Sequence, residues 1–174
     1  MVGGSGYPRF MSAPETSART STGTARSAAP ANRPSTRQRV VLAVFVAWTA
    51  YVWASRIANA LGSDTESTGG KIFSTVLSIA LLALAAAVVT VMVRSWKAPL
   101  TVGGAKVLAV AAGATIIVWL IRVPQILMTD HGPEVNGTAF NIVHTMLGVV
   151  SVVLAALVWQ IAVPVLRSKG EGRR

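Results

Sequence analysis

Four long apolar runs dominate the chain, at about residues 40–61, 72–93, 105–128 and 140–166. The first contains Arg56, the third contains Lys106 near its start and Arg122 near its end, and the second contains no charged residue. Roughly 20 apolar residues in a helix span the hydrocarbon layer of a bilayer. Each run reaches that length, so the pattern predicts four transmembrane helices.

Two other architectures would need a different pattern. A soluble helical bundle needs a polar face on each helix, whereas the second run, IFSTVLSIALLALAAAVVTVMV, is apolar all round apart from small hydroxyls. Strands of an outer-membrane barrel are about ten residues long and alternate in polarity. The prediction is therefore an all-α fold, an integral membrane four-helix bundle, whose short connections make consecutive helices antiparallel neighbours.

The segments that flank the runs are polar and basic. Residues 1–38 are rich in Ser, Thr, Pro and Arg and almost lack aromatic residues. Such a segment buries too little apolar area to offset the entropy of ordering. We therefore expect a disordered basic tail over 1–38, a membrane domain over 39–167 and a second basic tail over 168–174.

The distribution of charge predicts the orientation. Apolar residues make up 52% of the chain and charged residues 13%, and the net charge is +10. Thirteen of the sixteen Lys and Arg residues fall on one side of a four-helix topology, and only Arg56, Lys71 and Arg122 fall on the other. Since Lys and Arg in short loops mark the cytoplasmic side, we expect a multi-pass plasma (inner) membrane protein with both termini in the cytoplasm. Its basic tails should contact anionic inner-leaflet lipids, and placement at helix ends argues against a nucleic-acid partner.

A cluster of polar residues is expected near the outer ends of the helices. Its members are Arg56, Arg122, Gln125, Asn141 and His144. The two arginines could simply extend to the headgroups as anchors. Alternatively, Arg122 pairs with an anionic partner or with an outer acid, and His144 forms a hydrogen bond to another helix. The outer acids are Asp64, Glu66, Asp130 and Glu134.

Small and aromatic residues indicate how the helices pack. Small residues spaced by four let membrane helices approach closely, and the series Ala105, Ala109 and Gly113 is the best candidate. Shorter pairs are Ala43 with Ala47, Ala50 with Ala54, Ala83 with Ala87, and Ser151 with Ala155. Interfacial tryptophans anchor helices at headgroup depth. We expect Trp96 at the inner interface and Trp53 and Trp119 toward the outer one.

The sequence offers little catalytic chemistry. Without cysteine there is no disulfide, thiolate ligand or cysteine nucleophile. The two histidines, His131 and His144, are too few for a haem or zinc site, and the hydrolase and nucleotide-binding motifs are missing. No acid lies within the four runs, which argues against an autonomous proton or ion carrier. We expect no enzyme activity, metal or cofactor.

The segment IRVPQILMTD, followed by FNIVHTMLGVVSVVLAALVW and combined with a basic N-terminal tail, resembles small four-helix membrane proteins of actinobacteria. Some of these are accessory subunits of envelope complexes such as the Mce-type lipid transporters. The resemblance lies in the layout and implies no catalytic residue. It suggests a non-enzymatic accessory or scaffold subunit packed against integral membrane proteins. The alternative is a small oligomeric channel, carrier or lipid-binding bundle.

Overall fold

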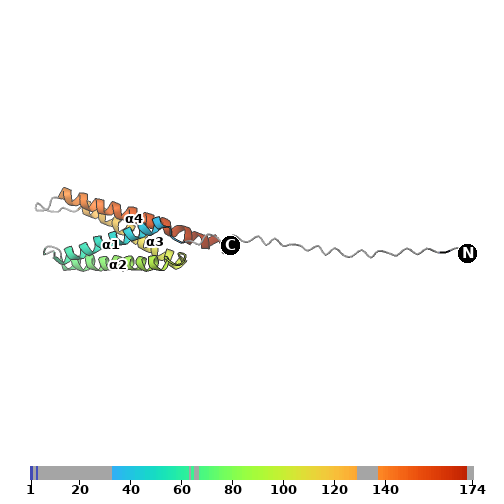
Figure 1. The fold of residues 1–174 in the computed structure, drawn as a ribbon. Helices are drawn as coiled ribbons and strands as arrows, with labels where there is room; N and C mark the ends of the chain where they lie inside the picture. Colours follow the sequence, from blue (N-terminus) through green and yellow to red (C-terminus); the bar gives the residue numbers. More distant parts are fainter. Residues whose placement is uncertain (2, 4–32, 63, 65–66, 129–136, 172–174) are drawn as a thin grey trace. The chain divides into compact units, whose positions relative to one another are not determined.

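The computed structural model describes residues 1, 3, 33–62, 64, 67–128 and 137–171. Within them the chain forms four α-helices: α1 (Thr36–Gly62), α2 (Thr68–Arg94), α3 (Val102–Met128) and α4 (Gly137–Glu171) (Figure 1). All four are long and apolar enough to cross a membrane. A helix of 27 residues, such as α1, is about 40 Å long, while the hydrocarbon layer is about 30 Å thick. The predicted all-α, membrane-spanning four-helix bundle is confirmed.

The helices begin before the apolar runs because polar residues cap their first turns. Ser35 and Gln38 form a reciprocal capping box: the Ser35 N–H donates to Gln38 Oε1 at 2.8 Å, and the Gln38 N–H donates to Ser35 Oγ at 3.3 Å. Ser67 and Thr101 cap α2 and α3 through hydroxyls that accept from backbone N–H groups three residues later. Residues 36–38, expected in the N-terminal tail, are therefore helical.

The C-terminal end of α4 also extends beyond the prediction. Helix α4 continues past residue 167 to Glu171, so part of the second basic tail is helical. Of the tail predicted over residues 1–38, residues 2 and 4–32 lie outside the described residues.

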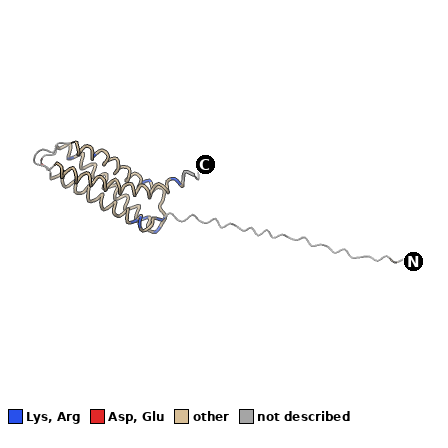
Figure 2. Tube along the Cα trace, turned by 90° about the horizontal axis from the view of Figure 1, so that it is seen from above, with Lys and Arg blue, Asp and Glu red and all other residues tan. Residues whose placement is uncertain are grey.

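Neighbouring helices are antiparallel and close a ring. Helix α3 packs most extensively against α4, and α1 against α2, while α1–α4 and α2–α3 are less extensive (Figure 1). We call the end where α1 and α3 begin the basic end, and the end where α1 leads to α2 and α3 to α4 the hairpin end. Figure 2 shows Lys and Arg gathered at the basic end. The described ones there are Arg33, Arg37, Arg39, Arg94, Lys97, Lys106 and Arg167.

The half of the bundle toward the basic end has an apolar core. Leu42 and Phe45 of α1 pack with Val88 of α2, Leu108 of α3 and Val158 of α4, and each is at most 2% exposed. Four alanines complete the α3–α4 contact, at positions 105, 112, 155 and 162. Close packing of small residues is how helices associate in lipid.

The tight seam of α3 differs in register from the predicted one. Ala105 is fully buried as expected, but Ala109 and Gly113 are only half-buried. The next buried positions are Leu108, Ala111 and Ala112 instead. The reason is geometric: a helix turns every 3.6 residues, so steps of exactly four drift away from the seam.

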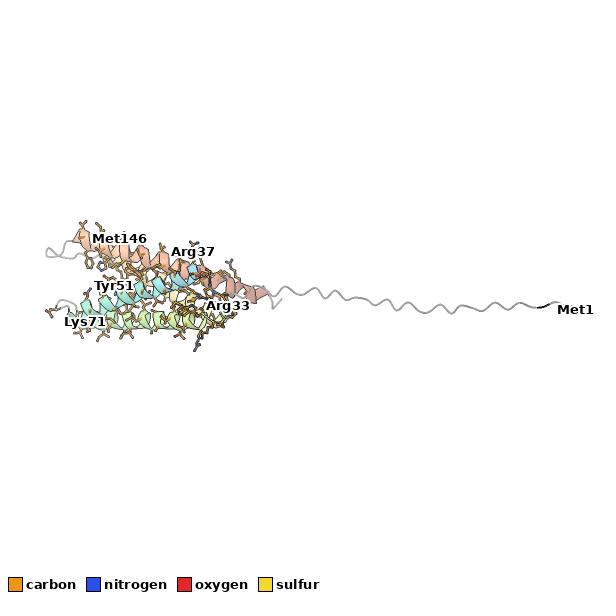
Figure 3. The ribbon with its side chains drawn as sticks, in the orientation of Figure 1. Met1, Arg33, Arg37, Tyr51, Lys71 and Met146 are labelled. Atoms are coloured by element: carbon orange, nitrogen blue, oxygen red, sulfur yellow. The ribbon has the colours of Figure 1, made fainter. Side chains whose placement is uncertain are left out.

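The outer surface of the bundle is apolar on all four helices. Ile79 of α2, Leu120 of α3 and Met146 of α4 are each more than half exposed. Figure 3 labels Met146 and Tyr51, which is 65% exposed. Such a surface suits contact with lipid tails, which are as apolar as Leu.

Candidate interaction site at the hairpin end

The middle and the hairpin half of the bundle have a more polar interior than the basic half. Buried hydroxyls there belong to Thr49, Ser74, Ser78, Thr115 and Ser151. Ser78, Thr115 and Ser151 donate to the carbonyl four residues earlier in their own helix, at 2.7 to 2.9 Å. This bond uses the hydroxyl proton and leaves the oxygen able to accept a second bond. The buried hydroxyls are therefore acceptors for donors from neighbouring helices.

Arg56 uses one of these acceptors. Its Nε donates to Ser74 Oγ at 2.7 Å, which ties α1 to α2. Arg56 lies six residues before the end of α1, or about 9 Å along the axis. Because α1 overhangs a 30 Å layer by roughly 5 Å at each end, the Cα of Arg56 lies about 4 Å inside the hydrocarbon. The guanidinium therefore sits where a long side chain can still reach the headgroups.

Arg122 approaches the same region of α2 from α3. Its Cζ lies 5.9 Å from the centre of the Phe73 ring, within the range of a cation–π interaction. Phe73 adjoins Ser74, so the two arginines contact consecutive residues of α2. The acids Asp130 and Glu134, predicted as partners of Arg122, lie outside the described residues, and that pairing stays a prediction.

Trp53 and Trp119 pack inside the bundle rather than at the outer interface. They are 5% and 6% exposed, and their ring centres are 6.4 Å apart across the diagonal between α1 and α3. Gly148 of α4 makes room for Trp119, because a Cβ there would lie 2.9 Å from the Trp119 ring. The prediction of two interfacial anchors was wrong for these residues, since both rings lie inside the bundle, and the Trp119 ring occupies the space that a side chain at Gly148 would need.

Trp119 leaves one buried donor without a partner: its Nε1 finds no acceptor among the described residues. A buried, unsatisfied N–H typically costs about 1–3 kcal/mol. The hydrogen-bonding groups of the interior are thus less completely paired in the hairpin half.

His144 bonds within its own helix. Its Nδ1 lies 2.9 Å from the Phe140 carbonyl oxygen, and the two rings stack with centres 3.9 Å apart. In the described part of the chain this replaces the predicted bond to another helix. The spacing of four residues explains it, because positions i and i+4 adjoin on a helix. Of the other predicted cluster members, Asn141 is half-buried and Gln125 is exposed on the outside.

A cross-helix bond that the sequence analysis missed joins α1 to α4. Trp48 Nε1 donates to Ser151 Oγ at 2.9 Å. The signal was present, since a buried indole N–H needs an acceptor and Ser151 interrupts an apolar run. The pairing itself could not be read from residues 103 positions apart.

The polar residues of the hairpin end can bind an anionic group and can hold helices together. Among the described residues, no group of three or more His, Cys, Asp and Glu side chains could hold a metal ion. The two guanidinium groups, from α1 and α3, instead present positive charge beside the first turns of α2. That geometry can attract an anionic group at headgroup depth.

Comparison with known proteins gives no family: no protein-family model, curated protein or solved structure matches this chain.

Proposed function

We propose that this chain is a non-enzymatic accessory or scaffold subunit that packs against larger integral membrane proteins in the plasma membrane. The observation that carries the proposal is an alanine face on α1 that the bundle leaves unused. Ala43, Ala47 and Ala54 all point outward. In lipid, small residues at such spacing let the backbone of a second helix approach closely.

The interior supports the same role. The described cross-helix contacts of Trp48, Arg56 and Arg122 hold the bundle's own helices together. Polar side chains used in this way serve the cohesion of the bundle, which a scaffold requires. A lipid transporter is the complex that the layout of the sequence favours.

The orientation belongs to the proposal too. The described Lys and Arg residues gather at the basic end (Figure 2), and such residues mark the cytoplasmic side of a membrane protein. We therefore place the basic end, and with it both termini, in the cytoplasm.

The alternative function is a small oligomeric channel or carrier. The unpartnered Trp119 Nε1 and the buried hydroxyls of the hairpin half favour it, because polar groups inside a membrane bundle can line a solute path. A subunit should be purified in a complex with a larger membrane protein, whereas a channel or carrier should be purified as a homo-oligomer that conducts solute.

The test is purification of the tagged chain from its native membrane in mild detergent, followed by native electrophoresis and mass spectrometry. We expect a stoichiometric complex with a larger membrane protein. Ala47→Leu should abolish it by blocking close approach, whereas Val110→Leu, on the exposed face of α3 (58% exposed), should leave it intact.

Recovery of the unmodified chain alone would overturn the subunit role. A homo-oligomer that conducts solute when reconstituted in vesicles would establish the alternative. Equal loss of the complex in both leucine variants would refute the alanine face as the contact.

A further inference from the structure

A cleft of about 400 Å³ opens at the basic end between the end of α2 and the start of α3. Several of the residues that line it are small. Ala87 and Val91 line it from α2, and Gly103, Gly104 and Val107 line it from α3. The volume falls within the usual range of small-ligand sites, about 300–1,000 Å³.

The rim of the cleft is cationic. Arg94, the last residue of α2, lines it and is exposed. It has no hydrogen bond or ion pair with any residue that the structure describes. Lys97 follows three positions later and is also exposed. None of the lining residues is acidic, so the opening attracts anions.

The other polar groups of the rim are already engaged. Thr90 Oγ1 donates to the Ala86 carbonyl at 3.1 Å, and Thr101 Oγ1 accepts from the Gly104 N–H at 3.1 Å. Ser95 closes α2, because its N–H bonds to carbonyls of the last turn. Arg94 is therefore the one cationic group among the described lining residues, and the Thr101 hydroxyl keeps its proton available to donate to a ligand beside it.

The cleft runs from headgroup depth into the hydrocarbon. Arg94 is seven residues beyond Ala87, which corresponds to about 10 Å along the helix. Trp96, 59% exposed, marks the level of the interface beside the rim. A ligand that fits must combine a negative group at the rim with an apolar chain below it.

We propose that this cleft binds one anionic phospholipid, with its phosphodiester at Arg94 and the upper part of an acyl chain along Ala87, Val91 and Val107. The positive charge of the rim and the apolar floor below it favour this ligand over other anions and other lipids. A free anion would leave the apolar floor uncovered, and a zwitterionic lipid would bring its own cation to Arg94. The proposal does not depend on the subunit role.

The test is a lipid titration of the purified full-length chain in detergent, read by native mass spectrometry. Dioleoyl phosphatidylglycerol should bind as a single tight adduct, at least about fivefold tighter than dioleoyl phosphatidylcholine. Arg94→Gln should weaken phosphatidylglycerol by about fivefold. Arg37→Gln, which removes an exposed arginine of the same end outside the cleft, should have no effect.

A second variant tests the cleft itself. A Cβ at Gly103 would meet only Thr101 Oγ1, at 3.9 Å, so Gly103→Leu can fold while its side chain fills the space. It should abolish the tight adduct, and glycerophosphate should not compete with the lipid. Equal weakening by Arg94→Gln and Arg37→Gln, full binding by Gly103→Leu, equal affinity for the two lipids, or displacement by glycerophosphate would each overturn the proposal.

Discussion

Gly148 lies where α4 and α3 approach so closely that no room is left for a side chain. A Cβ added there would lie 2.7 Å from Val123 Cγ2 and 2.9 Å from Trp119 Cε3, distances that real Cβ contacts do not show. Neither neighbour yields easily. Val123 is β-branched and stiff at χ1 in a helix, and Trp119 is 6% exposed between three helices. The Gly148→Ala substitution should therefore force α4 away from α3.

The expected cost follows from two opposing effects. Overpacking a close-packed interior costs about 1–3 kcal/mol. Alanine recovers up to about 1 kcal/mol over glycine in a helix. With a mid-range overpacking cost of about 2 kcal/mol, the net result is destabilisation by about 1 kcal/mol, most of it from separation of the α3–α4 pair.

The assay is SDS unfolding of the purified protein in mixed micelles, followed by tryptophan fluorescence. Gly113→Ala is the matched control, because its Cβ would lie an ordinary 3.8 Å from Trp159 Cζ3 and should be neutral or slightly stabilising. If Gly148→Ala matched or exceeded the unmodified protein in stability, the close approach of α3 and α4 described above would be wrong.

Three further outcomes are expected. Trp48→Phe and Ser151→Ala should each destabilise the bundle by about 0.5–1.5 kcal/mol, and a double-mutant cycle should return a coupling of about 0.6 kcal/mol; full additivity would show that the 2.9 Å bond contributes nothing. Ser74→Ala removes an acceptor of Arg56 and should destabilise the bundle by about 0.6 kcal/mol in the same SDS titration; if the variant were as stable as the unmodified protein, Arg56 would act as a headgroup anchor alone. A green fluorescent protein fused after the last residue should fluoresce and an alkaline phosphatase fusion should be inactive, and the reverse pattern would contradict the proposed orientation.

Sequence reasoning predicted the helices because the signal for each is local. Length and continuous apolarity set where a segment can leave water, and the four predicted runs lie within the four observed helices, apart from small differences at the ends. The ends differ because caps such as Ser35–Gln38 extend a helix beyond its apolar run. Such pairs are visible in the sequence but were assigned to the tail.

The interior could not be predicted because it depends on helix rotation. A transmembrane helix that is apolar all round gives no periodic signal for the face it buries. Trp53 and Trp119 therefore fit the pattern of interfacial anchors, although the absence of a side chain at Gly148 lets Trp119 lie inside the bundle, where Trp53 packs against it. For the same reason Ala43 and Ala47 of α1, which looked like a packing pair, point outward.

The two halves of the bundle are held together by different forces. Toward the basic end, residues such as Phe45, Leu108 and Val158 interlock with almost no exposure, and dispersion sums over many contacts. Toward the hairpin end, the bond of Arg56 to Ser74 carries cohesion instead, and side-chain hydrogen bonds in membrane proteins average only about 0.6 kcal/mol. A scaffold built this way is rigid where its cationic end meets the bilayer surface and more adaptable at the opposite face. The alanine face of α1 begins in the rigid half, at Ala43 and Ala47, and reaches the adaptable half at Ala54, so a partner helix that packed along it would contact both halves.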